Sequence, residues 1–316
     1  MIELKKMENK TEQFMFLGVI FYLIAGASYL FTRDLILLFN FTYIGTVVIF
    51  GLAFYSRLQN NKKEKARRFI QFFIGMYMVI VVGYVWEENI QLESFIINLL
   101  AIIGGDVGAF ATASILHYLI AKTIGVSIIG RNWCGWACWF PAILNLFPYK
   151  ESKGRIRKLE FIPYVNLIAT ILISCYIYYN EYNYGNYKSN IRVFIFTSLG
   201  IYYTIGIVMT LLLKDNRAIC KYFCAVPIIQ KIFMPLSIFY IKLDKDRCID
   251  CKLCEKVCSM DVNITKYRDK GLNVTAKSCI QCRKCVESCP KKALSIKANL
   301  KRGKTREFIN YKSTDK

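Results

Sequence analysis

Eight cysteines in the C-terminal part of this 316-residue chain stand in two runs of identical spacing. Each run reads C-x2-C-x2-C-x3-C, and Pro290 follows the second. The runs consist of Cys248, Cys251, Cys254 and Cys258, and of Cys279, Cys282, Cys285 and Cys289. This spacing holds [4Fe–4S] clusters through cysteine thiolates. The runs therefore predict two such clusters and one-electron transfer as their chemistry.

The cluster ligands are expected to cross between the runs, because the fourth cysteine of each run ligates the other cluster in two-cluster domains. One predicted set is Cys248, Cys251, Cys254 and Cys289, and the other is Cys279, Cys282, Cys285 and Cys258. Zinc is a poorer interpretation, since zinc sites pair two C-x2-C units across a long spacer. Disulfides are also disfavoured, and cluster ligands indicate that this part of the chain lies in reducing cytosol.

A second repeat, R-x2-C-x3-C-x2-P-x-I, occurs at residues 131–143 and again at 217–229, 86 residues later. Each copy follows an apolar segment, which suggests two related halves of a membrane domain. The cysteines of this repeat are Cys134, Cys138, Cys220 and Cys224. Because residues i and i+4 of a helix share a face, we expect each pair to lie on one helix face.

Two such pairs facing each other could bind one metal ion or cluster, or act as dithiols that exchange electrons. Arg131 and Arg217 would favour the thiolate forms. The alternative is that these cysteines are buried small hydrophobic residues at helix ends, where free cysteine is common. The repetition of the whole pattern favours a metal or redox site.

Hydrophobic residues make up 55% of the chain, although its formal net charge is +21. The two properties are separated along the sequence, which predicts a membrane part and a basic aqueous part. Six apolar segments are long enough, or nearly so, to cross a bilayer at about 1.5 Å per residue. They are Phe14–Phe31, Leu35–Tyr55, Phe69–Trp86, Val107–Ile129, Phe161–Tyr179 and Val193–Leu213. The expected fold is an α-helical integral membrane domain of about six transmembrane helices with a C-terminal α+β dicluster ferredoxin domain.

The fourth segment is irregular. Its apolar run starts near Phe95 and is interrupted by Gly104, Gly105 and Asp106, which fits a broken helix or a re-entrant turn shielded by protein or water. Asp106 marks either a polar pocket or a helix cap.

Lysine and arginine residues predict the orientation. Fifteen of them lie before the first predicted span, between the second and third spans, or between the fourth and fifth spans. Only three lie in the connections on the opposite side of the membrane. A multi-pass protein of the cell membrane is therefore expected, with both termini in the cytoplasm. Its regions are a transmembrane domain at 1–235, a 2×[4Fe–4S] domain at 236–299 and a basic tail at 300–316.

The ferredoxin-like region is expected to form two pseudo-symmetric βαβ-like halves, with strands near Ser237–Leu243, Leu272–Thr275 and Ala293–Lys297. Its basic surface favours anionic lipid headgroups or an acidic electron carrier such as a flavodoxin or ferredoxin. Nucleic acid is not an expected partner of a membrane-tethered domain.

His117 is the single histidine and falls within a predicted span. An intramembrane ionisable residue is a functional candidate, here to bind quinone or relay a proton. The alternative is a histidine hydrogen-bonded to a neighbouring helix. Trp133, Trp136 and Trp139 bracket a cysteine pair and form either an interfacial belt or part of a cofactor site.

Taken together, the paired motifs and the ferredoxin runs resemble the membrane polyferredoxins over roughly Val107–Ile296. Members include the membrane subunit that feeds periplasmic nitrate reductase (NapH type), the membrane protein of nitrous oxide respiration (NosR type) and a copper reductase of oxidase assembly (CcoG type). In that family a proline follows the second cysteine of each membrane motif directly, whereas Trp139 and Ala225 stand there in this chain. Ser259 likewise replaces the proline usual after Cys258.

Three functions remain open from the sequence. The first is electron exchange between a cytoplasmic carrier, the two clusters and a membrane partner such as quinone, which the resemblance to the nitrate reductase subunit implies. The second is a copper-type metal reductase or cofactor-assembly factor that uses the four membrane-proximal cysteines, since thiolates select soft metals. The third is a redox sensor or membrane anchor without turnover.

Overall fold

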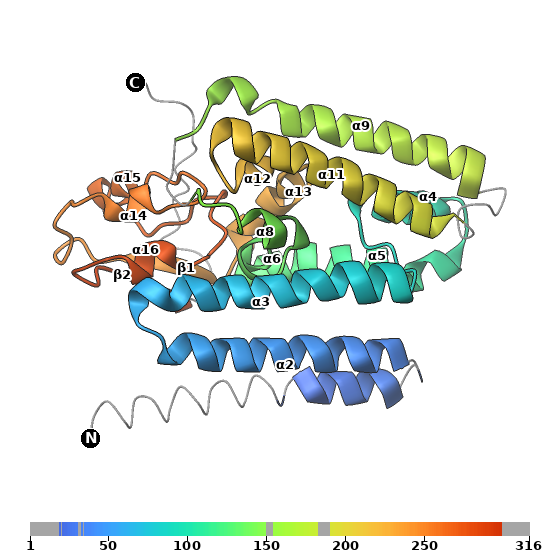
Figure 1. Ribbon diagram of the computed structural model, residues 1–316, viewed down its shortest axis with the longest axis horizontal. Helices are drawn as coiled ribbons and strands as arrows, with labels where there is room; N and C mark the ends of the chain where they lie inside the picture. Colours follow the sequence, from blue (N-terminus) through green and yellow to red (C-terminus); the bar gives the residue numbers. More distant parts are fainter. Residues whose placement is uncertain are drawn as a thin grey trace.

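The computed structural model describes residues 19, 21–30, 33, 35–149, 154–182 and 190–298. The predicted basic tail at 300–316 and the start of the first predicted span lie outside these residues. The described chain is mostly helical, with a small ferredoxin domain at one end of the long helices (Figure 1).

Four helical stretches are long and apolar enough to cross a membrane. They are α2 Leu35–Arg57, α3 Lys63–Tyr77 continued to Val85, Arg157–Asn180 containing α9 Ile162–Ile177, and α11 Ile191–Leu213. Figure 1 shows α2, α3, α9 and α11 extending along the length of the molecule. Much of their surface is exposed and apolar, including Phe50, Leu172 and Leu212, which indicates a membrane protein.

The shorter helices of this part are α4 Leu92–Ile103, α5 Ala113–Leu116, α6 Gly125–Ile129, α7 Asn132–Trp136, α8 Trp139–Leu144, α12 Ala218–Tyr222 and α13 Val226–Phe233.

The fourth predicted segment is broken. The stretch Ala113–Ile129 meets Asn132–Leu144 at 98°, and the pair counts as a fifth span if it is taken as one. The described part of the first predicted segment, Phe21–Leu30, is a short apolar helix. The expectation of six spans is therefore not confirmed for the described chain.

Two local features explain the breaks. Gly130 has φ +66°, a conformation that favours glycine, and it turns the chain between α6 and α7. Asp106 caps the 3-10 turn Val107–Ala111, its side chain accepting a hydrogen bond from the Gly108 amide at 3.0 Å. The capping interpretation of Asp106 thus holds, and the helix begins at Ala113 instead of Val107.

The ferredoxin domain is built on two antiparallel strands, β1 Phe239–Leu243 and β2 Leu294–Ala298. Its helices are α14 Leu253–Lys256, α15 Thr265–Asp269 and α16 Lys284–Glu287. The predicted first and last strands are found within two residues of their expected starts. The predicted middle strand is reduced to a single bridge between Ile241 and Val274.

The two cysteine runs adopt the same backbone conformation at a spacing of 31 residues. Asp250, Lys252 and Asp261 have positive φ angles, and so do the residues 31 positions later. Those counterparts are Gln281, Arg283 and Lys292. Non-glycine residues adopt this conformation at a cost of roughly 1–2 kcal/mol each, so its repetition marks two equivalent loops shaped for the same purpose.

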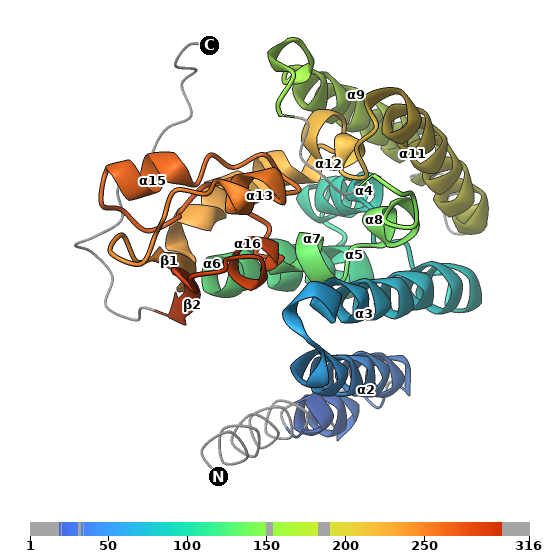
Figure 2. The same ribbon diagram turned by 60° about the vertical axis from the view of Figure 1, so that its left-hand side comes forward.

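Figure 2 shows the ferredoxin domain beside α6 and α7, and the Ile238 amide donates to the Ile128 carbonyl of α6 at 2.9 Å. Lys284 of α16 forms an ion pair with Glu64 of α3, with 2.9 Å between Nζ and Oε1. The basic connection between α2 and α3 therefore lies at the ferredoxin end of the helices.

A buried ion triad also joins the two parts. The Lys221 side chain of α12 is fully buried between Asp215, at 2.6 Å, and Asp261 of the ferredoxin domain. Asp261 follows the first cysteine run by three residues, so this contact fixes the first cluster loop relative to the second Cys-x3-Cys motif.

Replacing Lys221 by Met should strongly destabilise the protein, because two buried carboxylates lose their partner. Breaking a buried ion pair from one side costs about 3–5 kcal/mol. Arg247→Met is the matched control, since Arg247 and Asp244 form an exposed pair at 3.2 Å and exposed pairs contribute about 0–1 kcal/mol. Thermal unfolding in detergent should show a much lower midpoint for Lys221→Met, and equal midpoints would contradict the role of the triad.

Candidate metal centres

Four ferredoxin cysteines from both runs line one small cavity. They are Cys258 of the first run and Cys279, Cys282 and Cys285 of the second. This is the combination predicted for the second cluster. The cavity also contacts the apolar core of the domain through Ile241 and Val274, so the second set lies deep inside it.

Backbone amides point at the cysteine sulfurs. The Val262 amide donates to Cys258 Sγ at 3.3 Å, and the Ala293 amide, 31 residues later, donates to Cys289 Sγ at the same distance. The Gln281 amide donates to Cys279 Sγ at 3.4 Å. Successive amides in loops with left-handed residues form concave anion sites that hold iron–sulfur clusters. The chain therefore fits the two predicted [4Fe–4S] clusters, whose ligation remains a prediction.

The first predicted set lies nearer to the surface. Cys251 is exposed, whereas Cys285 is buried. Burial raises the pKa of the Cys254 thiol of this set to about 12. Metal binding would stabilise its thiolate form.

The membrane-proximal pairs have a different local structure from the one expected. Cys134 and Cys220 are each the third residue of a five-residue helix, α7 and α12. Cys138 and Cys224 lie beyond the ends of these helices, in the turns before α8 and α13. The expectation that each pair shares one helix face is therefore wrong.

The prolines explain this difference. Pro141 and Pro227 stand in the first turns of α8 and α13, where proline is favoured because it lacks an amide hydrogen. A new helix therefore starts after each second cysteine. The Cys138 amide still bonds to the Trp133 carbonyl at 3.0 Å, which folds each pair into a tight loop.

All four membrane-proximal cysteines line one cavity between the two motif copies. Its volume is about 60 Å³, several times the roughly 10–15 Å³ that one water needs. The shared site anticipated from the repeat is thus geometrically available. Among the described residues, no three histidine, cysteine or acidic side chains converge closely enough for a single metal ion, in this cavity or in the ferredoxin domain.

Each motif copy is held by a residue of the other. Arg217 of the second copy donates to the Cys134 carbonyl of the first at 2.9 Å. Arg131 of the first copy donates to Gln230 Oε1, beside the second copy, at 3.2 Å. Cys134 Sγ lies 3.2 Å from the same Gln230 oxygen. The two arginines therefore cross-link the halves of the site.

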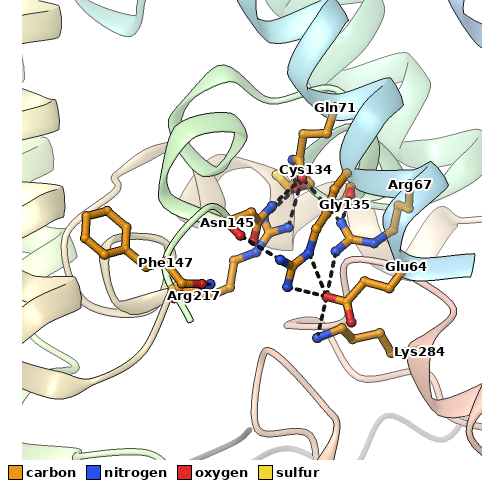
Figure 3. A network of polar contacts seen from close by, with 11 residues as sticks. Glu64, Arg67, Gln71, Cys134, Gly135, Asn145, Phe147, Arg217 and Lys284 are labelled. Atoms are coloured by element: carbon orange, nitrogen blue, oxygen red, sulfur yellow. Dashed lines mark hydrogen bonds and ion pairs between the residues drawn. The ribbon is translucent and has the colours of Figure 1, made fainter. Parts of the chain in front are cut away.

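A buried polar network from α3 supports the first loop (Figure 3). Gln71 Nε2 donates to the carbonyls of Cys134 and Cys138, both at 3.3 Å. Arg67 donates to the Gly135 carbonyl at 2.6 Å. Gln71 Oε1 in turn accepts from Asn145 Nδ2 at 2.7 Å. Hydrogen bonds that involve charged groups contribute about 1.5–3 kcal/mol each, so this network fixes the loop.

At Cys220 and Cys224, the second pair, burial has a larger effect on the thiol pKa than the arginines have. Burial raises the pKa of Cys220 although Arg217 opposes this, and it raises the pKa of Cys224 well above its usual range. Arg131 and Arg217 favour the Cys220 thiolate, as expected, but burial has the larger effect and raises the pKa of this thiol. Metal binding would supply the missing stabilisation.

The first motif touches the loop of the second ferredoxin cluster. A Cβ on Gly135 would lie 2.4 Å from the Ile280 carbonyl oxygen, so only glycine permits this approach. Trp136 Nε1 donates to the Gln281 carbonyl at 3.2 Å. Cys134 and Cys220 also pack against the ferredoxin core. The cavity and the second cluster loop are thus direct neighbours.

His117, Trp133 and Trp139 line the cavity, whereas Trp136 contacts the ferredoxin loop. The ring centroids of His117 and Trp133 are 5.2 Å apart in an edge contact. The structure therefore brings His117 to the four cysteines, and its role in binding quinone or moving protons stays a prediction.

Sequence reasoning missed Lys122 and Glu93, which also line the cavity. Lys122 lies within the predicted fourth span, and an ionisable residue in a span is a recognisable signal. Glu93 is half-buried through tertiary packing and accepts a hydrogen bond from Ser198 Oγ at 3.4 Å. Gln71 and Gln230 carry no motif and could only be found from the fold.

Comparison with known proteins gives a consistent assignment for the C-terminal part. Residues 247–294 match the family of 4Fe-4S dicluster domains. The chain is 28% identical over 258 residues to an uncharacterized protein of Methanocaldococcus jannaschii, MJ0749, covering 77% of this chain and 91% of that protein. It is 26% identical to MJ0750 of the same organism, covering 75% and 96%.

A 162-residue match, 25% identical, links the chain to the putative electron transport protein YccM of Escherichia coli. It covers 51% of this chain and 43% of YccM. No solved structure matches the chain. The protein therefore contains an iron–sulfur ferredoxin domain and is a distant relative of electron transport proteins.

Paired substitutions test the crossed ligation. Cys258→Ser with Cys279→Ser should remove one cluster and leave about half of the ferredoxin iron, because both residues belong to one predicted set. Cys258→Ser with Cys248→Ser should remove both clusters. Iron analysis and EPR of the anaerobically purified, reduced variants measure this, and the opposite pattern would assign each run to its own cluster.

Gly135→Ala should loosen the contact between the first motif and the second cluster loop, since its methyl group would overlap the Ile280 carbonyl. Amide hydrogen exchange at residues 280–284 should accelerate while the ferredoxin iron is retained. Gly200→Ala is the control, because a methyl group there meets no atom within 4 Å. Unchanged exchange in Gly135→Ala would show that this contact is not tight.

Proposed function

We propose that this protein is a membrane-bound iron–sulfur electron-transfer protein. It moves electrons between a cytoplasmic carrier, two [4Fe–4S] clusters and a membrane-side partner such as quinone. The observation that carries this proposal is the cavity lined by all four membrane-proximal cysteines, directly beside the loop of the second cluster. When bound, the clusters supply one-electron transfer.

The exposed and buried residues of the chain indicate where the proposed electron path would begin and end. Cys251 and Ile249, in the first run, are exposed and mark the side where a flavodoxin or ferredoxin would dock. Cys285 is buried, and Gly135 brings the cavity to the Ile280 carbonyl. The path thus runs from the aqueous surface, through the domain core, to the cavity between the helices.

The cavity also suits a partner from the membrane. Its lining is mainly apolar and aromatic, with Tyr118, Phe140 and Tyr202 beside His117, as is common in sites for small organic ligands. His117 and Glu93 are the groups that could exchange protons with a quinone there. The ferredoxin domain and the basic α2–α3 connection lie at the same end of the helices, which supports a cytoplasmic ferredoxin domain and cytoplasmic termini in the cell membrane.

Stopped-flow oxidation in liposomes tests the function. Reduced protein should be reoxidised by added quinone, with loss of ferredoxin absorbance recorded anaerobically. Cys134→Ser with Cys220→Ser should slow this at least tenfold while both ferredoxin EPR signals remain. Cys175→Ser is the control, since Cys175 is exposed on α9 and does not line the cavity.

Equal rates in the double variant and the control would contradict a route through the cavity. Reduction of Cu(II) by the wild type, lost in the same double variant while quinone is ignored, would instead support a metal reductase.

A further inference from the structure

We propose that the cavity holds a third iron–sulfur cluster, ligated by Cys134, Cys138, Cys220 and Cys224, with Lys122 as its counter-charge. This deepens the proposed function by giving its membrane end a cofactor: the cluster would occupy the cavity, and a quinone would exchange electrons with it from the His117 side instead of filling the cavity itself. Electron transfer into such a cluster moves one electron from the second ferredoxin cluster and makes or breaks no bond.

The arrangement of the sulfurs favours a cluster over a single ion. The four thiols line one cavity of about 60 Å³, yet no three metal-binding side chains of the described chain converge on one ion position. The same holds for the eight ferredoxin cysteines, whose loops are shaped for [4Fe–4S] clusters. Thiolates around a polynuclear iron–sulfide core stand farther apart than thiolates around one ion. A cluster would therefore explain the wide spacing of the cavity thiols in the same way as that of the ferredoxin cysteines.

The charges around the cavity require an anionic occupant. Lys122 is 6% exposed and lines the cavity, and its ammonium lies 4.9 Å from the Trp133 ring centroid. Within the described ranges it has no hydrogen-bond acceptor and no carboxylate partner. It lines the same cavity as Cys134, Cys138 and Cys224. An uncompensated buried ammonium is costly, and four thiolates around an iron–sulfide core provide the missing negative charge.

Unused hydrogen-bond donors point to the same conclusion. Trp139 Nε1 and Arg131 Nη2 are buried without an acceptor in the described chain, and both residues line the cavity. Buried donors of this kind normally have partners. Sulfide and thiolate sulfurs accept hydrogen bonds, and such bonds together with nearby charge set the potential of a cluster.

The test starts with the composition of the anaerobically purified full chain. We expect clearly more than about eight irons, with matching acid-labile sulfide, where two [4Fe–4S] clusters alone give about eight. The excess should disappear in Cys134→Ser with Cys220→Ser and persist in Cys175→Ser. About eight irons with quinone-linked oxidation intact would overturn the third cluster but leave the proposed function standing. Copper or zinc in place of the excess iron would also overturn it.

Lys122 is tested by redox titration followed by EPR. Lys122→Met should shift the potential of the additional signal downward, because a positive charge that favours the reduced cluster is lost. Lys122→Arg should retain it, and the two ferredoxin signals should not move in either variant. An additional signal with the same potential in Lys122→Met and the wild type would remove Lys122 from this role.

Discussion

The structure depends on the cross-linking of two short cysteine loops by buried polar side chains. Arg217 reaches from the second motif to the Cys134 carbonyl, and Arg131 reaches from the first motif to Gln230. These groups lie between apolar helices, where an unsatisfied carbonyl or guanidinium is expensive. Neither motif can adopt its conformation without the other, so the two halves of the chain assemble around one cavity.

This constraint extends into the ferredoxin domain. Gly135 brings the first loop onto Ile280, while Lys221 ties the second motif to Asp261 and Lys284 ties α16 to Glu64. The domain is therefore held at three points from three helical segments. A cluster loop fixed in this way keeps a constant separation from the cavity, which the proposed electron transfer between them would need.

The charge pattern follows from the same geometry. Lys122 and Arg131 are placed against thiols in a buried cavity, with Glu93 as the one carboxylate among the described lining residues. At the second pair, burial and the neighbouring thiols raise the pKa of Cys220 and Cys224, and Arg217 opposes this at Cys220. Cations beside the sulfurs would stabilise thiolate ligands, and the proposed metal centre rests on this charge pattern.

The sequence by itself determined the chemistry and the repeats. Cysteine spacing predicts the ferredoxin domain that the family match supports, and the two outer strands begin within two residues of their predicted starts. Pro141 and Pro227 break each Cys-x3-Cys pair locally. Tertiary structure decided the number of described spans and the convergence of four cysteines with His117, Lys122 and Glu93. This convergence depends on contacts between residues far apart in the sequence, such as Arg131 with Gln230. No local pattern encodes such contacts, since they arise only when the two halves pack.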